Sequence, residues 1–361
     1  MHAQKSTQTG AQTDAQTDAQ TRGRFFEDFI PGEVIRHATP RTVGREERVL
    51  ATALYPNRFA LDSADTFAAA CGFRQSPVDP LTVFHVVFGK TVPDISLNAV
   101  ANLGYAEGRF LAPVYPGDTL RAESAVIGRR QTGSGKAGIV WVRTTGLNQR
   151  GDAVLSYVRW VMVNKRDTAS AAPEAVIPDL AQSVPAGEIV LPEGLDFTDY
   201  DAELAGGPRL WGDYAAGEKI DHVDGLVIEE AEHMMATRLW QNTARVHFDP
   251  AARGGQPRLV YGGHIISIAR GLSFNGLENA QLIAAINAGT HVAPAFAGYT
   301  VYAWSEVLET AETAAPSVGA LRLRLVATKN RPAADFPHRG EDGKHAPGVI
   351  LDLDYWVLMP R

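Results

Sequence analysis

The chain has 361 residues, which suits two domains of ordinary size, each large enough to bury its own core. Its net charge of −7 gives no electrostatic case for nucleic-acid binding. The single cysteine, Cys71, excludes an intrachain disulfide and any multi-cysteine metal site, so we expect a reducing cytoplasm. No apolar run approaches the roughly 18–20 residues that a membrane-spanning helix needs.

The first part of the chain combines a polar tail with a predicted domain. Residues 1–24 repeat the letters AQTD without an apolar stretch, so we expect a disordered tail. Residues 25–165 follow as the first predicted domain. Its expected elements are a strand at 32–39, helices near 44–55 and 81–89, and strands at 106–112, 118–130, 139–148 and 154–164.

The second part of the chain repeats this order after a linker. Residues 166–208 are rich in Ala, Pro, Asp and Glu and lack periodicity, which is typical of a linker. Residues 209–361 form the second predicted domain, with a strand at 219–228, helices at 229–240 and 263–274, and strands at 300–308, 320–328 and 349–358. Helices followed by antiparallel strands indicate an α+β fold. We expect a curved sheet around one apolar helix in each domain, and the two units side by side.

Three segments occur twice in the same order, roughly 180–200 residues apart, which indicates a duplicated domain. The pairs are PGEVIRH at 31–37 with AGEKIDH at 216–222, FLAPVYPGDTL at 110–120 with PAFAGYTV at 294–301, and VLSYVRW at 154–160 with ILDLDYW at 350–356. Differences between the copies should therefore show which half carries the chemistry.

Several segments resemble the MaoC-like, (R)-specific enoyl-CoA hydratase family: PVYPGDTL at 113–120, the Asn-Gln-Arg-Gly turn at 148–151, and the His-x-Asp element at 247–249. The long runs 85–120 and 148–167 are similar to its double-hotdog branch of mesaconyl-CoA hydratases, also called β-methylmalyl-CoA dehydratases, of the ethylmalonyl-CoA pathway. The resemblance implies a tandem double hotdog and a hydro-lyase for a CoA thioester. It implies an acyl-CoA as the partner and no metal or redox cofactor, and it leaves a homo-oligomer open.

The resemblance also points to catalytic residues in the second copy. The family's catalytic element is Asp-x-Asn-Pro-x-His-x-Asp, and His247 occupies its histidine position. The first copy has Ala60 and Tyr55 where the element has its histidine and first aspartate, and neither can shuttle a proton at neutral pH. We therefore expect a degenerate first copy that forms a substrate wall, and a catalytic second copy.

One departure from the family leaves the proton partner of His247 open. Asn242 stands in the place of the first aspartate, and an amide can orient water or the imidazole but cannot transfer a proton. The candidates for the partner are Asp249 and Glu229 nearby in the sequence, Asp62 or Asp79 from the first copy, or no second group at all.

A second family feature separates the copies in the same way. The family presents the thioester carbonyl to a backbone N–H at the start of its second helix, where such a donor stabilises a developing enolate. The second copy has Tyr261, Gly262 and Gly263 there, whereas the first has Pro80, which carries no N–H. The first copy thus lacks both the catalytic histidine and the backbone N–H donor.

The branch's acyl group ends in a free carboxylate, which a guanidinium binds well. Arg58 and Arg245, in the matching loops of the two copies, are the leading candidates, with Arg41 as a third and solvated surface charge as the alternative. Three other functions remain open: a hydratase for another acyl-CoA, an acyl-CoA thioesterase, and a non-catalytic acyl-CoA-binding protein.

Overall fold

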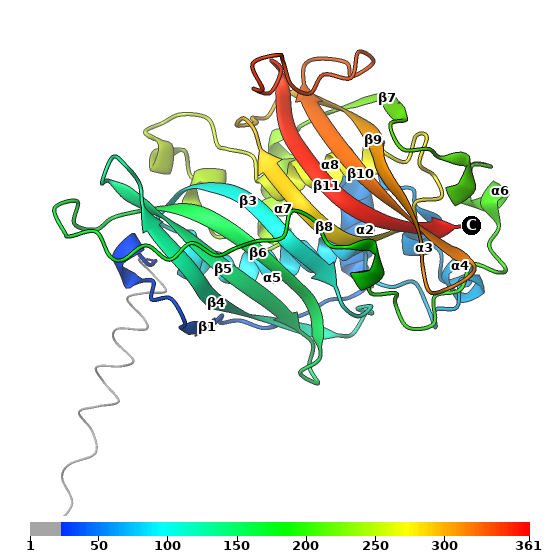
Figure 1. Cartoon of the computed structure of the whole chain (residues 1–361), viewed down its shortest axis with the longest axis horizontal. Helices are drawn as coiled ribbons and strands as arrows, with labels where there is room; N and C mark the ends of the chain where they lie inside the picture. The colour runs from blue at the N-terminus through cyan, green and yellow to red at the C-terminus, as the bar shows by residue number, and fades with distance from the viewer. Residues whose placement is uncertain (1–22) are drawn as a thin grey trace, which may run out of the picture.

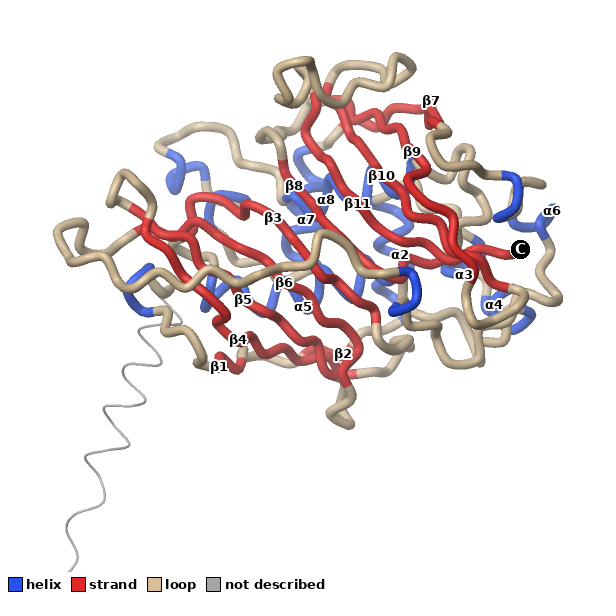
Figure 2. Tube along the Cα trace, in the orientation of Figure 1, coloured by secondary structure: helices blue, strands red, loops and turns tan. Residues whose placement is uncertain are grey.

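The computed structural model describes residues 23–361. They contain a long antiparallel sheet with the long α-helices on one face (Figures 1 and 2). The strands are β1 (Val34–Arg36), β2 (Arg41–Thr42), β3 (Ala99–Phe110), β4 (Thr119–Gln131), β5 (Ala137–Leu147), β6 (Ala153–Asn164), β7 (Lys219–Val227), β8 (Leu282–His291), β9 (Thr300–Glu312), β10 (Val318–Lys329) and β11 (Val349–Pro360). The α-helices are α2 (Arg45–Leu54), α3 (Ala60–Ser63), α4 (Asp65–Ala70), α5 (Pro80–Ile95), α6 (Ala202–Ala205), α7 (Glu230–Leu239) and α8 (Gly262–Leu272). The 3-10 helices are η1 (Phe26–Asp28), η2 (Ala186–Glu188), η3 (Trp211–Asp213), η4 (Arg245–His247) and η5 (Pro250–Arg253).

The two copies of the duplicated unit meet in the middle of this sheet. The strand order is β1-β4-β5-β6-β3-β8-β11-β10-β9-β7, with β2 on β4, so β3 of the first copy pairs with β8 of the second. In this pairing Tyr105 lies opposite Gly289 and Ala106 opposite Ala288. The predicted α+β double hotdog is confirmed, but its two sheets merge into one continuous sheet across the β3–β8 pair.

Each half wraps its sheet around one buried helix, α5 in the first copy and α8 in the second. A helix that is apolar on nearly all sides is stable only inside a core, which explains both positions. Helix α5 starts at Pro80, after Asp79 accepts a hydrogen bond from the Thr82 amide at 3.0 Å. It runs to Ile95, beyond the end expected at residue 89. No helix among residues 23–361 has the length and apolar character needed to cross a membrane.

Strand β8 is absent from the sequence-based expectation, and burial explains why. Its residues from Leu282 to Asn287 are all buried, so the apolar–polar alternation that marks a half-exposed strand does not occur. Helices cover one face of this central strand, and the segment 166–190, green in Figure 1, crosses the opposite face of the sheet. The amide of Val184 donates to Asn287 Oδ1 at 2.8 Å, and Trp356 donates to the Val184 carbonyl at 2.9 Å.

The region expected to be a linker therefore contributes a few residues to the core, although most of it is exposed or half-buried. Val184, Leu195 and Phe197 are buried in a hydrophobic cluster with strands of the second copy. At the other end of the chain, the expected tail 1–24 lies outside the described residues except for Gly23 and Arg24. The Arg24 guanidinium forms an ion pair with Glu33 at 2.7 Å, so Arg24 contacts the domain that was expected to begin at residue 25.

Candidate active site

A cavity of about 340 Å³ lies between the two copies and is lined by both. The first copy contributes the end of α5, the first part of β3 and two residues of β6. The second copy contributes the loop after α7, the start of α8, the segment after β8 and one residue of β11. Of the residues expected to act in catalysis or binding, His247, Asn242, Tyr261 and Gly262 line this cavity.

The matching location in the first copy is almost closed. A pocket of about 20 Å³ is lined there by Asn57, Asp62 and Asp79 among others. Tyr55, at the position matched by Asn242, is buried, and its hydroxyl accepts a hydrogen bond from Trp240 at 3.2 Å. A volume of this size holds no acyl group, so the geometry favours one substrate site for each chain.

This difference in volume predicts the binding stoichiometry. Titration of the protein with a slowly reacting CoA thioester should saturate at one equivalent per chain, because only the larger cavity has room for an acyl group. Isothermal calorimetry would measure this number directly. Two equivalents of similar affinity would contradict a closed first copy.

His247 ends η4 with its ring fixed in one orientation. Its Nδ1 lies 2.8 Å from the carbonyl oxygen of Leu259, which can only accept a hydrogen bond, so Nδ1 carries the hydrogen and Nε2 keeps its lone pair. Burial lowers the pKa of His247 to about 4. The imidazole is therefore neutral at pH 7 and has a free basic nitrogen, as a general base requires.

Asn242 is buried beside His247, where its side chain closes a turn. Its Oδ1 accepts a hydrogen bond from the amide of Ala244 at 3.0 Å. Since the oxygen is engaged in this turn, Nδ2 is the end of the amide that can donate to water or substrate. The side chain thus suits an orienting role.

None of the four carboxylates considered as partners of His247 lines the cavity. Asp249 caps η5 by accepting from the Ala251 amide at 2.9 Å, and Glu229 is exposed just before α7. Asp62 and Asp79 line the small pocket of the first copy. Among the described residues that line the large cavity there is no aspartate or glutamate, so of the alternatives left open this geometry favours the one without a carboxylate partner.

The cavity contains a second imidazole instead, that of His291 at the end of β8. Its Nε2 lies 3.2 Å from the hydroxyl of Tyr105, and burial, with a further contribution from the neighbouring His247, lowers the pKa of His291 to about 4. Sequence reasoning missed His291 because it missed β8. The unbroken apolar run from Leu282 to Ile286 was the available signal, since short continuous runs indicate strands buried on both faces.

The N-terminus of α8 opens into the same cavity. Gly262 is its first residue, and the first amides of a helix have no acceptor within the helix and lie at its positive end. The ring of His291 packs directly against Gly262, so a Cβ at this position would overlap it. A Cβ at Gly263 would overlap Tyr261 and His85, which makes Gly263 a packing residue rather than part of the lining.

The three arginines expected to hold the acyl carboxylate lie elsewhere. Arg58 stacks on Phe274, 4.3 Å from the ring centroid, and donates to Asn275. Arg41 forms an ion pair with Glu47 at 2.5 Å, and Arg245 is exposed on η4. These placements correct the expectation, which came from the positions of the loops in the sequence rather than from the directions of the side chains. A different arginine, Arg159 of β6, lines the cavity.

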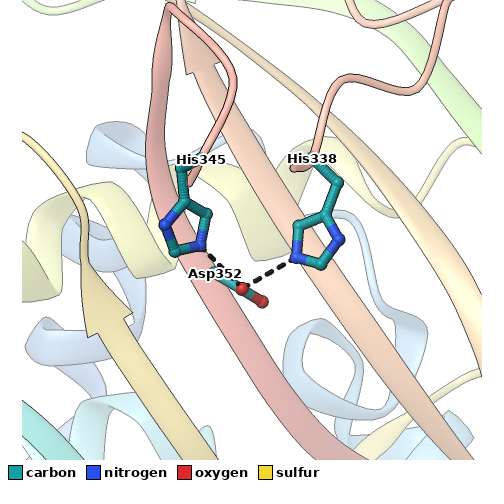
Figure 3. A group of neighbouring side chains, drawn as sticks. All are labelled: His338, His345 and Asp352. Carbon is teal, nitrogen blue, oxygen red and sulfur yellow. Dashed lines mark hydrogen bonds and ion pairs between the residues drawn. The ribbon is translucent and has the colours of Figure 1, made fainter. Parts of the chain in front are cut away.

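A group of possible metal ligands lies where the loop between β10 and β11 contacts strand β11, outside the cavity lining. His338 and His345 both contact Asp352 Oδ2, at 2.8 and 2.9 Å, and the three ligand atoms lie within 4.8 Å of one another (Figure 3). Arg324 and Arg339 also lie 3.6 and 3.5 Å from this carboxylate. Burial raises the pKa of Asp352, but these hydrogen bonds and charges outweigh it and hold the pKa below its usual range. The contacts anchor the loop to β11, and a cation here would face two guanidinium groups.

Because several histidines are buried, we expect the fold to lose stability in mild acid. Burial lowers the pKa to about 4 for His222, His247 and His291, and to about 3 for His85 and His264. The unfolded chain binds these protons below about pH 6.5, so the free energy of unfolding should fall as the pH drops from about 6.5 to about 4. Each histidine contributes up to ~1.4 kcal/mol per pH unit. Urea unfolding at pH 7, 6 and 5 would show this, and equal stability at all three would contradict it.

Known proteins are similar to this chain in sequence and in structure. A family model described as mesaconyl-CoA hydratase matches residues 4–337. The mesaconyl-CoA hydratase of Cereibacter sphaeroides is 68% identical over 339 residues, which cover 94% of this chain and 98% of that protein. The β-methylmalyl-CoA dehydratase of Chloroflexus aurantiacus is 58% identical over 346 residues, covering 94% and 97% of the two chains. A crystal structure of a putative MaoC domain dehydratase from Chloroflexus aurantiacus superposes with a TM-score of 0.90 at 58% identity, covering 94% and 98%. The chain belongs to the mesaconyl-CoA hydratase family.

Proposed function

We propose that this protein is a hydro-lyase that interconverts β-methylmalyl-CoA with mesaconyl-CoA and water. The observation that carries the proposal is the meeting of a neutral, oriented imidazole and a helix N-terminus in one cavity between the copies. The names of the two curated relatives supply the substrate. The acyl-CoA is thus the expected partner, and the reaction needs no redox cofactor or metal because the thioester itself acidifies the α-carbon.

In the proposed reaction each of these groups has a task. In dehydration, Nε2 of His247 takes the α-proton, and the negative charge that develops on the thioester oxygen is stabilised by the N–H of Gly262. The C–O bond at the β-carbon then breaks, and the hydroxyl leaves as water with a proton. His247 supplies this proton, the one it took from the α-carbon, because the pKa of about 4 leaves the imidazole of His291 neutral. Hydration runs through the same steps in reverse.

The rival functions fit the cavity less well. A hotdog thioesterase would need a carboxylate that directs water at the thioester carbonyl, and no described residue of the lining supplies one. A non-catalytic acyl-CoA-binding protein would not need the tautomer of His247 that the Leu259 carbonyl fixes. We place the reaction in the cytoplasm, which agrees with a single, buried and unpaired thiol, Cys71.

An absorbance assay for the enoyl thioester tests the proposal. β-Methylmalyl-CoA, (R)-3-hydroxybutyryl-CoA and an unrelated acyl-CoA would be compared, with a thiol reagent present in a parallel reaction. We expect enoyl-thioester absorbance to rise fastest with β-methylmalyl-CoA and no release of free CoA. Release of CoA without enoyl absorbance would indicate a thioesterase, and faster reaction of (R)-3-hydroxybutyryl-CoA would indicate a general hydratase.

A further inference from the structure

Arg159 occupies an unusual position for a charged residue, in the middle of β6. It lies opposite Tyr105 of β3 and Val142 of β5, and it is 0% exposed. Residues two apart along a strand share a face, so Arg159 shares the face of Tyr157 and Val161 that looks toward α5. Arg159 and Val161 both line the large cavity. A permanent positive charge is thus built into the wall of the candidate active site.

The partners of Arg159 are neutral. Its guanidinium donates to Thr91 Oγ1 at 2.7 Å and to Ser96 Oγ at 3.0 Å, and it lies over the ring of Phe88, 4.3 Å from the centroid. Its Nε has no hydrogen-bond partner. Burial lowers the pKa of Arg159, and the only groups that oppose this effect are tyrosines, with no carboxylate among them. A buried cation without an anion is costly, so an anion that enters the cavity would be strongly favoured.

A second unsatisfied polar group lies close by. Asn102 of β3 lines the same cavity and pairs with Val161, two residues along β6 from Arg159. Both polar atoms of its side chain are buried and have no hydrogen-bond partner. Buried amides are nearly always hydrogen-bonded in folded proteins, so this one also indicates a missing ligand. An amide N–H beside a guanidinium is suited to the two oxygens of a carboxylate.

The other half of the molecule provides an internal comparison. The match of VLSYVRW with ILDLDYW places Tyr355 at the position of Arg159, so the second copy has no arginine in this place. The buried arginine beside the small pocket is Arg270 of α8. Burial lowers its pKa, but the charges of Asp62 and Asp79 oppose this effect. The arginine near the closed pocket therefore has two carboxyl groups of the protein in its surroundings, whereas no carboxyl group opposes the effect of burial on the arginine at the open cavity.

We infer that Arg159, Ser96 and Asn102 form a subsite for a free carboxylate at the far end of the acyl chain. The ligand class is a CoA thioester of a dicarboxylic acid, and the guanidinium supplies the charge that makes this class preferred over monocarboxylic acyl-CoA. This inference rests on the proposed function, since it places the carboxylate of mesaconyl-CoA in the same cavity as His247.

The test compares substrates and inhibitors that differ only at this carboxylate. For Arg159→Met, kcat/KM for mesaconyl-CoA hydration should fall on the order of 10²–10³-fold, and that for crotonyl-CoA, which lacks the carboxylate, by less than about tenfold. Arg159→Lys should recover part of the loss, since it keeps the charge but not the fork. Arg143→Met, which breaks a half-exposed ion pair with Glu107 in the same sheet, is the matched control. It should leave kcat/KM unchanged for both substrates.

Wild-type protein provides an independent measurement in case Arg159 variants do not fold. Succinyl-CoA, with the terminal carboxylate, should inhibit at least tenfold more strongly than butyryl-CoA, which ends in a methyl group. Equal inhibition by the two CoA thioesters would overturn the carboxylate subsite. So would an equal loss of kcat/KM for mesaconyl-CoA and crotonyl-CoA in Arg159→Met. A wild-type protein that does not hydrate mesaconyl-CoA would instead overturn the proposed function, so the two failures are distinct.

Discussion

Replacing His247 with alanine is expected to lower kcat for hydration by roughly 10²–10⁴-fold, the range for a positioned proton-transfer group. The hydrogen bond to the Leu259 carbonyl leaves Nε2 as the one basic atom of this ring, and the variant removes it. Burial lowers the pKa of His247 to about 4, so the wild-type rate should stay level from neutral pH down to about 5. It should then fall as the imidazole becomes protonated, since a protonated base cannot take the α-proton.

His338→Ala is a suitable control for this variant. His338 also contacts a single acceptor, Asp352, but it lies on the loop before β11 and outside the cavity lining. Its loss should affect thermal stability more than kcat. A folded His247→Ala protein with nearly wild-type kcat would refute the assignment of His247 as the base.

The substitution Gly262→Pro is expected to lower kcat by roughly 10²–10³-fold, the cost of one oxyanion donor. In the first copy, helix α5 begins with Pro80, and Gly262 is the matching first residue of α8. The substitution therefore gives the second copy the proline that the first copy has at this position. Proline is well tolerated as the first residue of a helix, and the backbone of Tyr261 is already extended, as a residue before proline requires. The helix should therefore persist while its N–H is removed.

Two further variants separate the loss of the donor from the effect of added volume. Gly262→Ala keeps the N–H but adds a Cβ that meets His291, so it measures the steric effect alone. Pro80→Gly restores an N–H in the first copy, where the pocket is closed, and should leave kcat unchanged. If alanine and proline at position 262 reduce kcat equally, crowding of His291 rather than the N–H explains the loss.

The sequence predicted the parts of this fold that have a local signature. Alternating strands such as β4, β5 and β10 and the repeated segments indicated the double hotdog, and the catalytic element indicated His247. Strand β8 lacked the alternating signature because both of its faces are buried, and with it His291 was missed. The segment 166–208 resembled a linker because its contacts with the sheet are long-range and leave no periodic pattern.

The acyl-binding residues were predicted less well because their positions depend on tertiary packing. Arg58 and Arg245 were chosen for their closeness in sequence to the catalytic loops, but Arg58 turns to Phe274 and Arg245 to the surface. Arg159 could have been chosen from its position in the alternating pattern of the strand. It shares a strand face with Leu155, Tyr157, Val161 and Val163, which are all buried, and a charge on such a face is a signal of function.

The pairing of β3 with β8 in a single chain has a consequence for how this catalyst could have diverged. In a symmetric dimer of identical hotdogs, every substitution would appear in both copies. A residue that suits the substrate wall would then also stand in the copy that provides the catalytic loop. Here Arg159 and Tyr355 occupy equivalent places with different side chains, as do His247 and Ala60. Fusion of the two units breaks the symmetry, so the wall and the catalytic loop of one cleft can change independently. It also keeps the two halves together at any dilution, because their association is intramolecular.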